Sequence, residues 1–376
     1  MYKLLIINPG STSTKIAVYE DENPVFVENL SHHPDETGNF KVITDQFEFR
    51  KGVIFDTLAK KGISIDSFAG VMARGGMLPS IEAGAYEVNE DMVWMLLNKP
   101  VHQHASNLAA ILAYAIAKKQ NIPAYIYDGV TVDEMEPILK LTGLPECRRR
   151  SYAHNLNLRA AAMRYVKEHG KSYKDCNLIV VHLGGGVSVT LHINGKIADV
   201  ISDEDGTFTP ERSGGLPIYQ VAELMESGKY DSKTFIHKLK NKSGLLAHLG
   251  VNDCRKVEQM IDSGDAGAKL VYEAMALNTA KNIGEEATVV NGDVEAIILT
   301  GGVTHSKMFT QMIREHVEFI APVFVYPGEN EMESLALGGL RVMRGEEIAK
   351  VFKLPEEFKI LKKETILPVW FQHLNL

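Results

Sequence analysis

The stretch IINPGSTSTKIAVY, residues 6–19, runs from an apolar segment into a turn of glycine, serine and threonine and then into a second segment. The second segment begins at Lys15 and alternates with the period of two that a strand requires. The stretch therefore predicts a β-hairpin. Its turn offers backbone N–H groups and hydroxyls, which are the donors that a phosphate group needs.

The same pattern returns in LIVVHLGGGVSVTLHINGKIADV, residues 178–200. An overlay of the two stretches pairs Asn8 with His182, Gly10 with Gly184, and Thr14 with Ser188. A third strand followed by glycines, EAIILTGGVTHS at 295–306, precedes a helical pattern. Because the first two copies are separated by the length of a domain, we expect a duplicated domain with a boundary near residues 148–151.

Neither turn matches the common phosphate-binding loops. The motif GxxxxGK[ST] and the dinucleotide motif GxGxxG both open a helix, and both are absent from these turns. A phosphate bound by this chain is therefore expected to lie over a hairpin turn rather than at a helix N-terminus.

The rest of the chain alternates between strand and helix patterns, which is typical of an α/β fold. We expect strands at 68–76 and 124–128, and helices at 89–98, 106–119 and 155–169. The chain has 376 residues, of which 45% are hydrophobic and 23% charged, as in an ordinary globular enzyme.

Charge and cysteine content argue against several classes of protein. The net charge of −8 gives no reason to expect nucleic acid or an anionic membrane as a partner. Three widely spaced cysteines, Cys147, Cys176 and Cys254, do not suggest a disulfide framework or a zinc site. The apolar start LLII is too short for a signal peptide, and no stretch is long enough to span a membrane. We therefore expect a soluble cytoplasmic protein.

Several motifs together resemble those of the acetate and butyrate kinases, the acetokinase family, and butyrate kinases in particular. These motifs are NPGSTSTK, HASNLAA, YDGVTVDEMEP, HLGGGVSV, PERSGG and PGENEMESLALGGLR. They occur in the family's order and cover essentially the whole chain. The resemblance implies the duplicated ribonuclease H-like α/β fold of the actin, Hsp70 and sugar kinase superfamily, with two lobes and an active-site cleft between them. Residues 1–150 and 335–376 would form the acyl-substrate and phosphate lobe, and 151–334 the nucleotide-binding lobe.

The activity implied by the resemblance is reversible in-line phosphoryl transfer from ATP to a short-chain carboxylate, foremost butyrate, giving an acyl phosphate and ADP. Mg²⁺ would accompany the nucleotide, and the protein would be a homo-oligomer. A carboxylate is already ionised at neutral pH, so the reaction needs charge neutralisation and alignment rather than a general base. Kinases of branched acids or acetate remain alternatives. More remote alternatives are a sugar kinase and a non-catalytic nucleotide-driven clamp of the same superfamily.

By the same resemblance, the catalytic residues are Arg74, His104, Asp128, His154 and Arg212. A planar guanidinium suits carboxylate and phosphate oxygens, which fits the two arginines. His102 is the alternative to His104. Asp133 and Glu134 are alternatives to Asp128.

ATP or ADP would be bound by Asn8, Gly10, Ser11, Ser13, Lys15, His182, Gly184, Gly185, Gly186, Asp253, Arg255, Gly301 and Gly302. Alternation leaves open whether Lys15 faces the phosphate or the rear of the sheet. Cys254 stands where acetate kinases have an aromatic residue in the adenine pocket. Mg²⁺ would lie near Asn8, Asp128 and Glu331, with Glu333 as the alternative to Glu331.

The length of the acid is the least determined property, because one methylene changes binding in an apolar pocket by only about 1–3 kcal/mol. Ala153 precedes His154 where acetate kinases carry phenylalanine. We hypothesise that the smaller side chain makes room for a longer acid.

Overall fold

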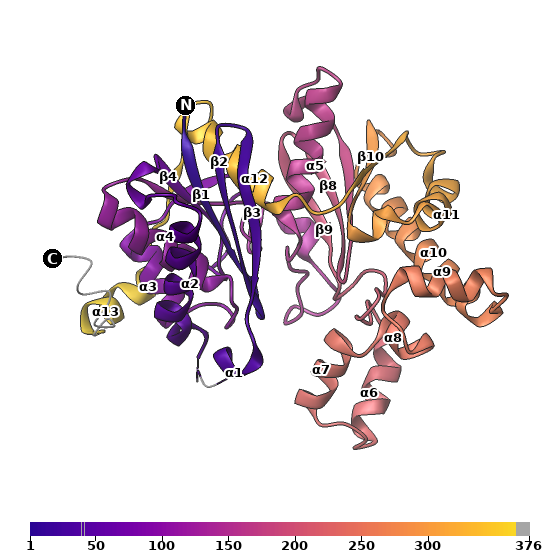
Figure 1. Ribbon diagram of the computed structural model, residues 1–376. Helices are drawn as coiled ribbons and strands as arrows, with labels where there is room; N and C mark the ends of the chain where they lie inside the picture. Colours follow the sequence, from indigo (N-terminus) through magenta and orange to yellow (C-terminus); the bar gives the residue numbers. More distant parts are fainter. Residues whose placement is uncertain (39, 41, 366–376) are drawn as a thin grey trace. The chain divides into compact units, whose positions relative to one another are not determined.

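A computed structural model of the chain describes residues 1–38, 40 and 42–365. The chain divides into two compact units (Figure 1). Unit 1 consists of Met1–Val132 and Asn330–Leu376, and unit 2 of Asp133–Glu329. The sequence predicted lobe borders after Arg150 and Ser334. The assignment of the acyl substrate to one lobe and of the nucleotide to the other stays a prediction.

Unit 1 is built on a mixed sheet with the strand order β12-β5-β6-β4-β1-β2-β3. The strands are β1 (Lys3–Pro9), β2 (Ser13–Glu20), β3 (Asn23–Ser31), β4 (Gly70–Arg74), β5 (Ala85–Glu87), β6 (Ala124–Tyr127) and β12 (Lys350–Val351). Strands β1, β4 and β6 are parallel neighbours, and β2 returns antiparallel to β1. The carboxyl ends of the three parallel strands therefore meet at one edge of the sheet.

Helices cover both faces of this sheet. They are α1 (Pro34–Thr37), α2 (Phe47–Lys60), α3 (Glu90–Asn98), α4 (Asn107–Gln120), α12 (Glu331–Met343) and α13 (Glu356–Glu364), with 3₁₀ turns at Ile43–Gln46 and Ile65–Ser67. On one face, Ile7 and Ile16 belong to a core that includes residues of α2, α3 and α4. On the other face α12 contacts β1 and β4, and its Gly339 lies against Met72 and Leu4.

Unit 2 has a five-stranded sheet in the order β11-β10-β7-β8-β9. Its strands are β7 (Leu178–Leu183), β8 (Val187–Ile193), β9 (Lys196–Ile201), β10 (Ala296–Gly301) and β11 (Val323–Pro327). Its helices are α5 (Asn155–Glu168), α6 (Ile218–Glu226), α7 (Ser232–Asn241), α8 (Gly244–Leu249), α9 (Cys254–Asp262), α10 (Ala266–Val289) and α11 (Lys307–Val317). Three 3₁₀ turns occupy Pro137–Lys140, Tyr173–Asp175 and Gly302–His305.

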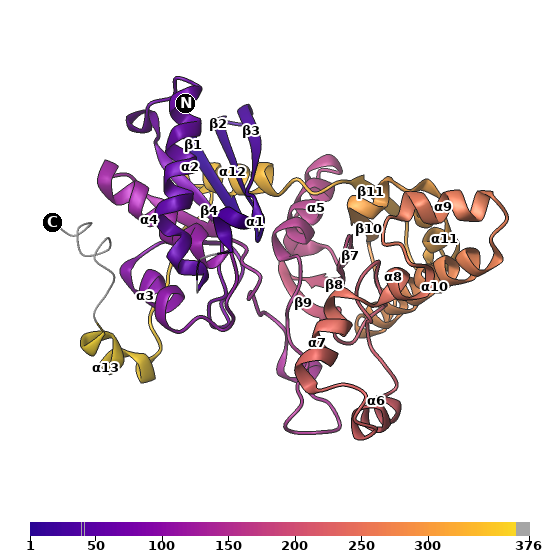
Figure 2. The same cartoon turned by 60° about the horizontal axis from the view of Figure 1, so that its bottom comes forward.

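The two faces of the unit 2 sheet follow the alternation of its strands. Ile179 and Val181 pack with α10 and α11, whereas Leu178 and Val180 pack with α5. The same layering is visible in Figure 1 and, after a 60° turn, in Figure 2. No helix among the described residues is long and apolar enough to cross a membrane.

The repeated hairpin is confirmed, but the overlay of Thr14 on Ser188 is wrong by one residue. In the first hairpin Asn8 pairs with Lys15, and in the second His182 pairs with Ser188. Lys15 is therefore the residue that corresponds to Ser188. The physical reason is the length of the turn, because residues 10–13 lie between the paired positions of the first hairpin and only 184–186 in the second.

Candidate functional site

The edge of the unit 1 sheet gathers polar side chains from sequence-distant elements. Asn8 lies near the end of β1, and Arg74 ends the neighbouring strand β4. The carboxylate of Glu331, at the start of α12, bridges them. It accepts a hydrogen bond of 2.7 Å from Asn8 Nδ2 and lies 3.0 Å from Arg74 Nη1. Three of the predicted site residues are thus brought together in unit 1.

Glu331 and Glu333 have different surroundings, and which of the two lies near the metal stays a prediction. Glu333 is exposed, and its charge acts on Tyr19, whose pKa is raised first by burial and then by Glu333. Only Glu331 contacts Asn8 and Arg74.

Asp128 follows β6, directly after the residue that pairs with Arg74 across β4 and β6. Its side chain is buried, and its Oδ1 accepts a 2.7 Å hydrogen bond from the N–H of Gly84. Its backbone has a left-handed φ of 41°. This conformation is uncommon for a residue other than glycine, and Asp is among the residues that tolerate it best.

The two acids that compete with Asp128 have structural partners in unit 2. Asp133 forms a 2.7 Å ion pair with Lys140. Glu134 accepts a 3.0 Å hydrogen bond from the N–H of Ile197, in β9. Both side chains therefore tie the segment that enters unit 2 to the rest of that unit.

His104 lies close to the Arg74 group, in the loop before α4. Its Nδ1 accepts a 3.1 Å hydrogen bond from the N–H of Ser106, so in the neutral ring the proton is on Nε2. Burial, and then the positive charge of Arg74, lower the pKa of His104. The lowered pKa favours the neutral ring, which can donate through Nε2. By the accessible surface of their side chains His104 and His102 are both exposed, and the carbonyl of His102 accepts a hydrogen bond from Asn107.

The first hairpin turn is exposed at Ser11, and its Gly10 N–H donates to Ser13 O at 2.8 Å. Lys15 is directly opposite Asn8 in the β1–β2 ladder, and opposed residues of an antiparallel pair point to the same face. Lys15 therefore faces the side of Asn8 and Glu331, not the rear of the sheet. Its ammonium has no hydrogen-bond or ion-pair partner among the described residues.

In unit 2 two histidines stack beside the second hairpin turn. The rings of His154 and His182 are 3.8 Å apart and nearly parallel, at 10°. His154 Nδ1 is 3.0 Å from the hydroxyl of Ser188. Since Ser188 pairs with His182 across β7 and β8, the stack is fixed to the base of the turn.

His182 is held by two residues that the sequence analysis did not single out. Asn157, on α5, donates from its amide to His182 Nδ1 at 2.8 Å, which leaves the proton on Nε2. Nε2 lies 3.3 Å from Glu329 Oε1. Glu329 belongs to the quoted motif PGENEMES, whereas Asn157 carried no signal of its own in the sequence.

Arg212 also approaches this turn. A methyl group built on Gly186 would lie 2.7 Å from Arg212 Nη1 and 3.1 Å from His154 Cε1. The guanidinium is oriented by a 2.8 Å ion pair with Asp203, another residue that the sequence analysis missed. Thr209 joins the Arg212 loop to the turn, since its hydroxyl donates to Gly185 O at 2.7 Å.

The residues expected to bind adenosine lie in two segments of the chain, and contacts between side chains connect these segments. Gly301 has φ of 97°, and a side chain there would collide with the backbone of Leu183, so the position requires glycine. Gly302 opens the 3₁₀ turn that leads to Ser306, the cap of α11. The hydroxyl of Tyr272 is 3.4 Å from that of Ser306 and also interacts with Cys254.

Asp253 and Arg255 flank Cys254 at the start of α9. The side chain of Asp253 accepts from the N–H of Arg255 and caps the helix, and the Arg255 guanidinium forms a 2.8 Å ion pair with it. Burial raises the pKa of Cys254 to about 11, so this thiol is protonated at neutral pH. In this arrangement the side chain of Asp253 caps α9.

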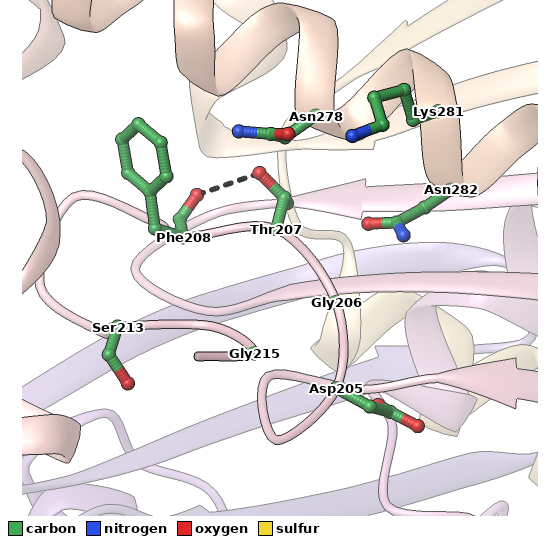
Figure 3. Close-up of a pocket in the computed structure, with 9 residues that line it drawn as sticks. All are labelled: Asp205, Gly206, Thr207, Phe208, Ser213, Gly215, Asn278, Lys281 and Asn282. Atoms are coloured by element: carbon green, nitrogen blue, oxygen red, sulfur yellow. Dashed lines mark hydrogen bonds between the residues drawn. The ribbon is translucent and has the colours of Figure 1, made fainter. Parts of the chain in front are cut away.

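A polar cavity of about 210 Å³ lies behind the Arg212 loop (Figure 3). One side of it comes from Asn278, Lys281 and Asn282 of α10, and the other from residues 205–208 with Ser213 and Gly215. The cavity therefore borders the same loop that positions Arg212, but from the side of α10.

Comparison with known proteins places these features in a family. The model of the acetokinase family matches residues 147–334, which is half of the chain. Among solved structures, the acetate kinase of Porphyromonas gingivalis is similar with a TM-score of 0.75 and 19% identity, over 91% of this chain and 100% of that one.

Two further solved structures are similar. The propionate kinase of Francisella tularensis subsp. tularensis SCHU S4 has a TM-score of 0.72 and 20% identity, over 90% of this chain and 99% of that one. The acetate kinase of Entamoeba histolytica has a TM-score of 0.70 and 16% identity, over 89% and 98%. At these identities the likeness shows a shared fold, which is the two-lobed α/β fold expected from the sequence. With half of its length matched by the family model, the chain belongs to the acetokinase family.

Proposed function

We propose that the protein transfers the terminal phosphoryl group of ATP to a short-chain carboxylate, foremost butyrate, and forms an acyl phosphate and ADP reversibly. Membership of the acetokinase family supports a carboxylate kinase. The observation that carries the proposal is the approach of both Arg212 and His154 to Gly186 in the second hairpin turn. A cationic fork and an imidazole beside a glycine turn form a site for a phosphate.

The proposed roles follow from the charges that must be neutralised. The acceptor carboxylate is ionised without a base, so the protein has to bring two anions together and hold them in line. Arg74 and Arg212 offset these charges, and His154 donates to the transferring group. The turns at Gly10–Ser13 and Gly184–Gly186, with Lys15, hold the phosphates, and Gly301, Gly302, Asp253 and Arg255 hold the adenosine.

The residues proposed to hold Mg²⁺ fit this ion, because Asn8, Asp128 and Glu331 all offer oxygen atoms. Asn8 donates its amide nitrogen to Glu331, which leaves its Oδ1 available. No cluster of three or more His, Cys, Asp or Glu suited to a metal occurs in the described part of the chain. Mg²⁺ commonly takes one or two carboxylates together with substrate phosphates, and when bound it supplies charge neutralisation.

The preference for butyrate rests on the motif resemblance and not on Ala153. Ala153 is buried in the core of unit 2 with Met135 and Leu158. A larger residue there would displace core side chains, so the position gives no independent measure of acid length. The cytoplasmic location and the homo-oligomeric state expected from the sequence also remain predictions.

The experiment that tests the proposal is a hydroxylamine trap. The protein is incubated with Mg²⁺, ATP and straight or branched acids from acetate to hexanoate, and the acyl hydroxamate is measured. We expect hydroxamate with the highest kcat/KM for butyrate. Neighbouring acids should follow within about 10–200-fold for each methylene.

A matched pair of variants on α12 shows whether the hydroxamate is formed at this site. Glu331→Gln removes the charge between Asn8 and Arg74, whereas Glu333→Gln changes an exposed carboxylate two residues away. The first should lose about 10²–10³ in kcat and the second almost nothing. If the highest rate is obtained with acetate or a branched acid, that acid replaces butyrate as the proposed substrate. If sugars are phosphorylated and no hydroxamate forms, the proposal of a carboxylate kinase is rejected.

A further inference from the structure

A buried arginine that the proposed site does not include lies beneath the first hairpin turn. Arg50, on α2, is completely buried. Its Nη1 donates to Ser13 O at 2.9 Å and to Thr14 Oγ1 at 3.0 Å, and its Nη2 donates to Ser11 O at 3.3 Å. Its Nε donates to Gln46 at 2.9 Å. Two of its four hydrogen bonds therefore hold the turn, and a third holds Thr14 directly after it.

These contacts set the direction of the peptide groups in the turn. A trans peptide places its C=O and the following N–H on opposite sides. Because Ser11 C=O points to Arg50, the N–H of Thr12 points away from α2. The carbonyl of Thr12 is also held, by the N–H of His32 at 2.8 Å. In the described part of the chain, the N–H groups of Ser11 and Thr12 have no partner.

The charge of Arg50 has no counter-ion among the described residues, since all four of its acceptors are neutral oxygens. Burial lowers its pKa to about 10, so the guanidinium is still charged at neutral pH. An unpaired buried charge is costly unless something offsets it. An anion on the open side of the turn would do so, and it would also accept from the free N–H groups.

We infer that Arg50 is a positioning residue for phosphate binding, which keeps the first turn in the conformation that receives the terminal phosphoryl group of ATP and adds a positive charge beneath it. Arg50 does not touch the ligand. It acts through Ser11, Thr12 and Ser13. The inference rests on the proposed function for the identity of the anion, since that function places the phosphates of ATP at the two hairpin turns.

The test compares ATP and ADP binding to the full-length protein by titration calorimetry. Arg50→Lys keeps the charge but cannot span the acceptors of a planar fork, and Arg50→Met removes both charge and donors. Ile54→Val is the matched control, because Ile54 lies one turn further along α2, is fully buried and belongs to the core. It lowers stability without touching the turn.

We expect both Arg50 variants to bind ATP about tenfold more weakly, with a much smaller change for ADP, which lacks the terminal phosphoryl group. Ile54→Val should bind both nucleotides as the wild type does. In turnover, Arg50→Lys should raise the KM for ATP and leave the KM for the acid unchanged. A purely structural arginine would not produce this selectivity.

Two results overturn the inference. One is a folded Arg50→Lys protein whose ATP affinity stays within about twofold of wild type. The other is an equal loss of ATP and ADP affinity in Arg50→Lys, which is what a general loss of stability would produce. If Arg50→Met does not fold, Arg50→Lys decides. Failure of the proposed function is seen separately, as an absence of hydroxamate from the wild type, while the ATP and ADP affinities of the variants can still be compared.

Discussion

At the scale of single residues, Gly185 and Gly186 are neighbours in one turn but have different surroundings. A methyl group on Gly186 would meet Arg212 at 2.7 Å and His154 at 3.1 Å. A methyl group on Gly185 would meet nothing within 4 Å. The triple glycine pattern in the sequence cannot rank these positions, because the difference comes from His154, the residue before α5, and from the Arg212 loop.

We predict that Gly186→Ala lowers kcat/KM by about 10²-fold, since a displacement of about 1 Å of a positioned catalytic group has an effect of this size. Gly143→Ala, at a unit 2 glycine outside the proposed site where an added methyl group would also meet nothing within 4 Å, is the control and should stay close to wild type. The hydroxamate assay measures both variants, and thermal unfolding checks that both are folded. Equal activity of the two variants would contradict the placement of Arg212 and His154 around Gly186.

At the scale of elements, α10 carries a buried carboxyl group that has no role in the proposed chemistry. Glu286 is 1% exposed, and its two carboxyl oxygens have no hydrogen-bond partner among the described residues. Burial, and then the charge of Asp199, raise its pKa well above the usual value. The group is therefore protonated in the folded protein at a pH at which the unfolded chain has lost the proton.

This raised pKa predicts a pH dependence of stability. A carboxyl in the unfolded chain titrates near pH 4.3, so above this pH the unfolded state is favoured by up to about 1.4 kcal/mol per pH unit until the folded group ionises. Glu286→Gln removes the effect. The variant should be more stable than wild type at pH 8, with a difference that shrinks as the pH falls toward 4.5.

Thermal unfolding at several pH values measures the difference. Glu285→Gln, at an exposed position on the same helix, is the control and should follow the wild type. If Glu286→Gln follows the same pH profile as wild type, the carboxyl of Glu286 is not protonated in the folded state.

Elements themselves were predicted well where their signal is local. Helical patterns predicted α3, α4 and α5, and Asn89 caps α3 by accepting from the N–H of Met92 as the sequence indicated. The register of the first hairpin was not predictable from the overlay, because it depends on a turn that is one residue longer than its counterpart.

At the scale of the whole molecule, unit 1 is discontinuous and unit 2 is a single stretch of chain. Helix α12, from the C-terminal segment, contacts β1 and β4. Its Leu335 and Leu340 are almost fully buried, as are Leu4 and Met72 of the sheet. Each such side chain contributes about 1.5–3 kcal/mol by its burial, so the sheet of unit 1 depends on this helix.

We predict that a fragment of residues 133–329 folds alone, whereas residues 1–132 fold only when 330–376 are joined to them by a short linker. Circular dichroism and thermal unfolding of the three fragments provide the measurement. A cooperative transition of 1–132 alone, at the temperature of the joined fragment, would show that α12 is dispensable for unit 1.

The sequence alone determined the two hairpins, the α/β alternation and the set of motifs that indicated a carboxylate kinase, because periodicity, turn composition and capping act over a few neighbouring residues. Only the tertiary structure decided that Glu331 rather than Glu333 meets Arg74, that Lys15 faces Asn8, and that Arg50 lies under the first turn. Each of these depends on where separate elements pack. A side chain's partners across the fold are fixed by the packing of strands and helices that are distant in the sequence, and no local pattern records them.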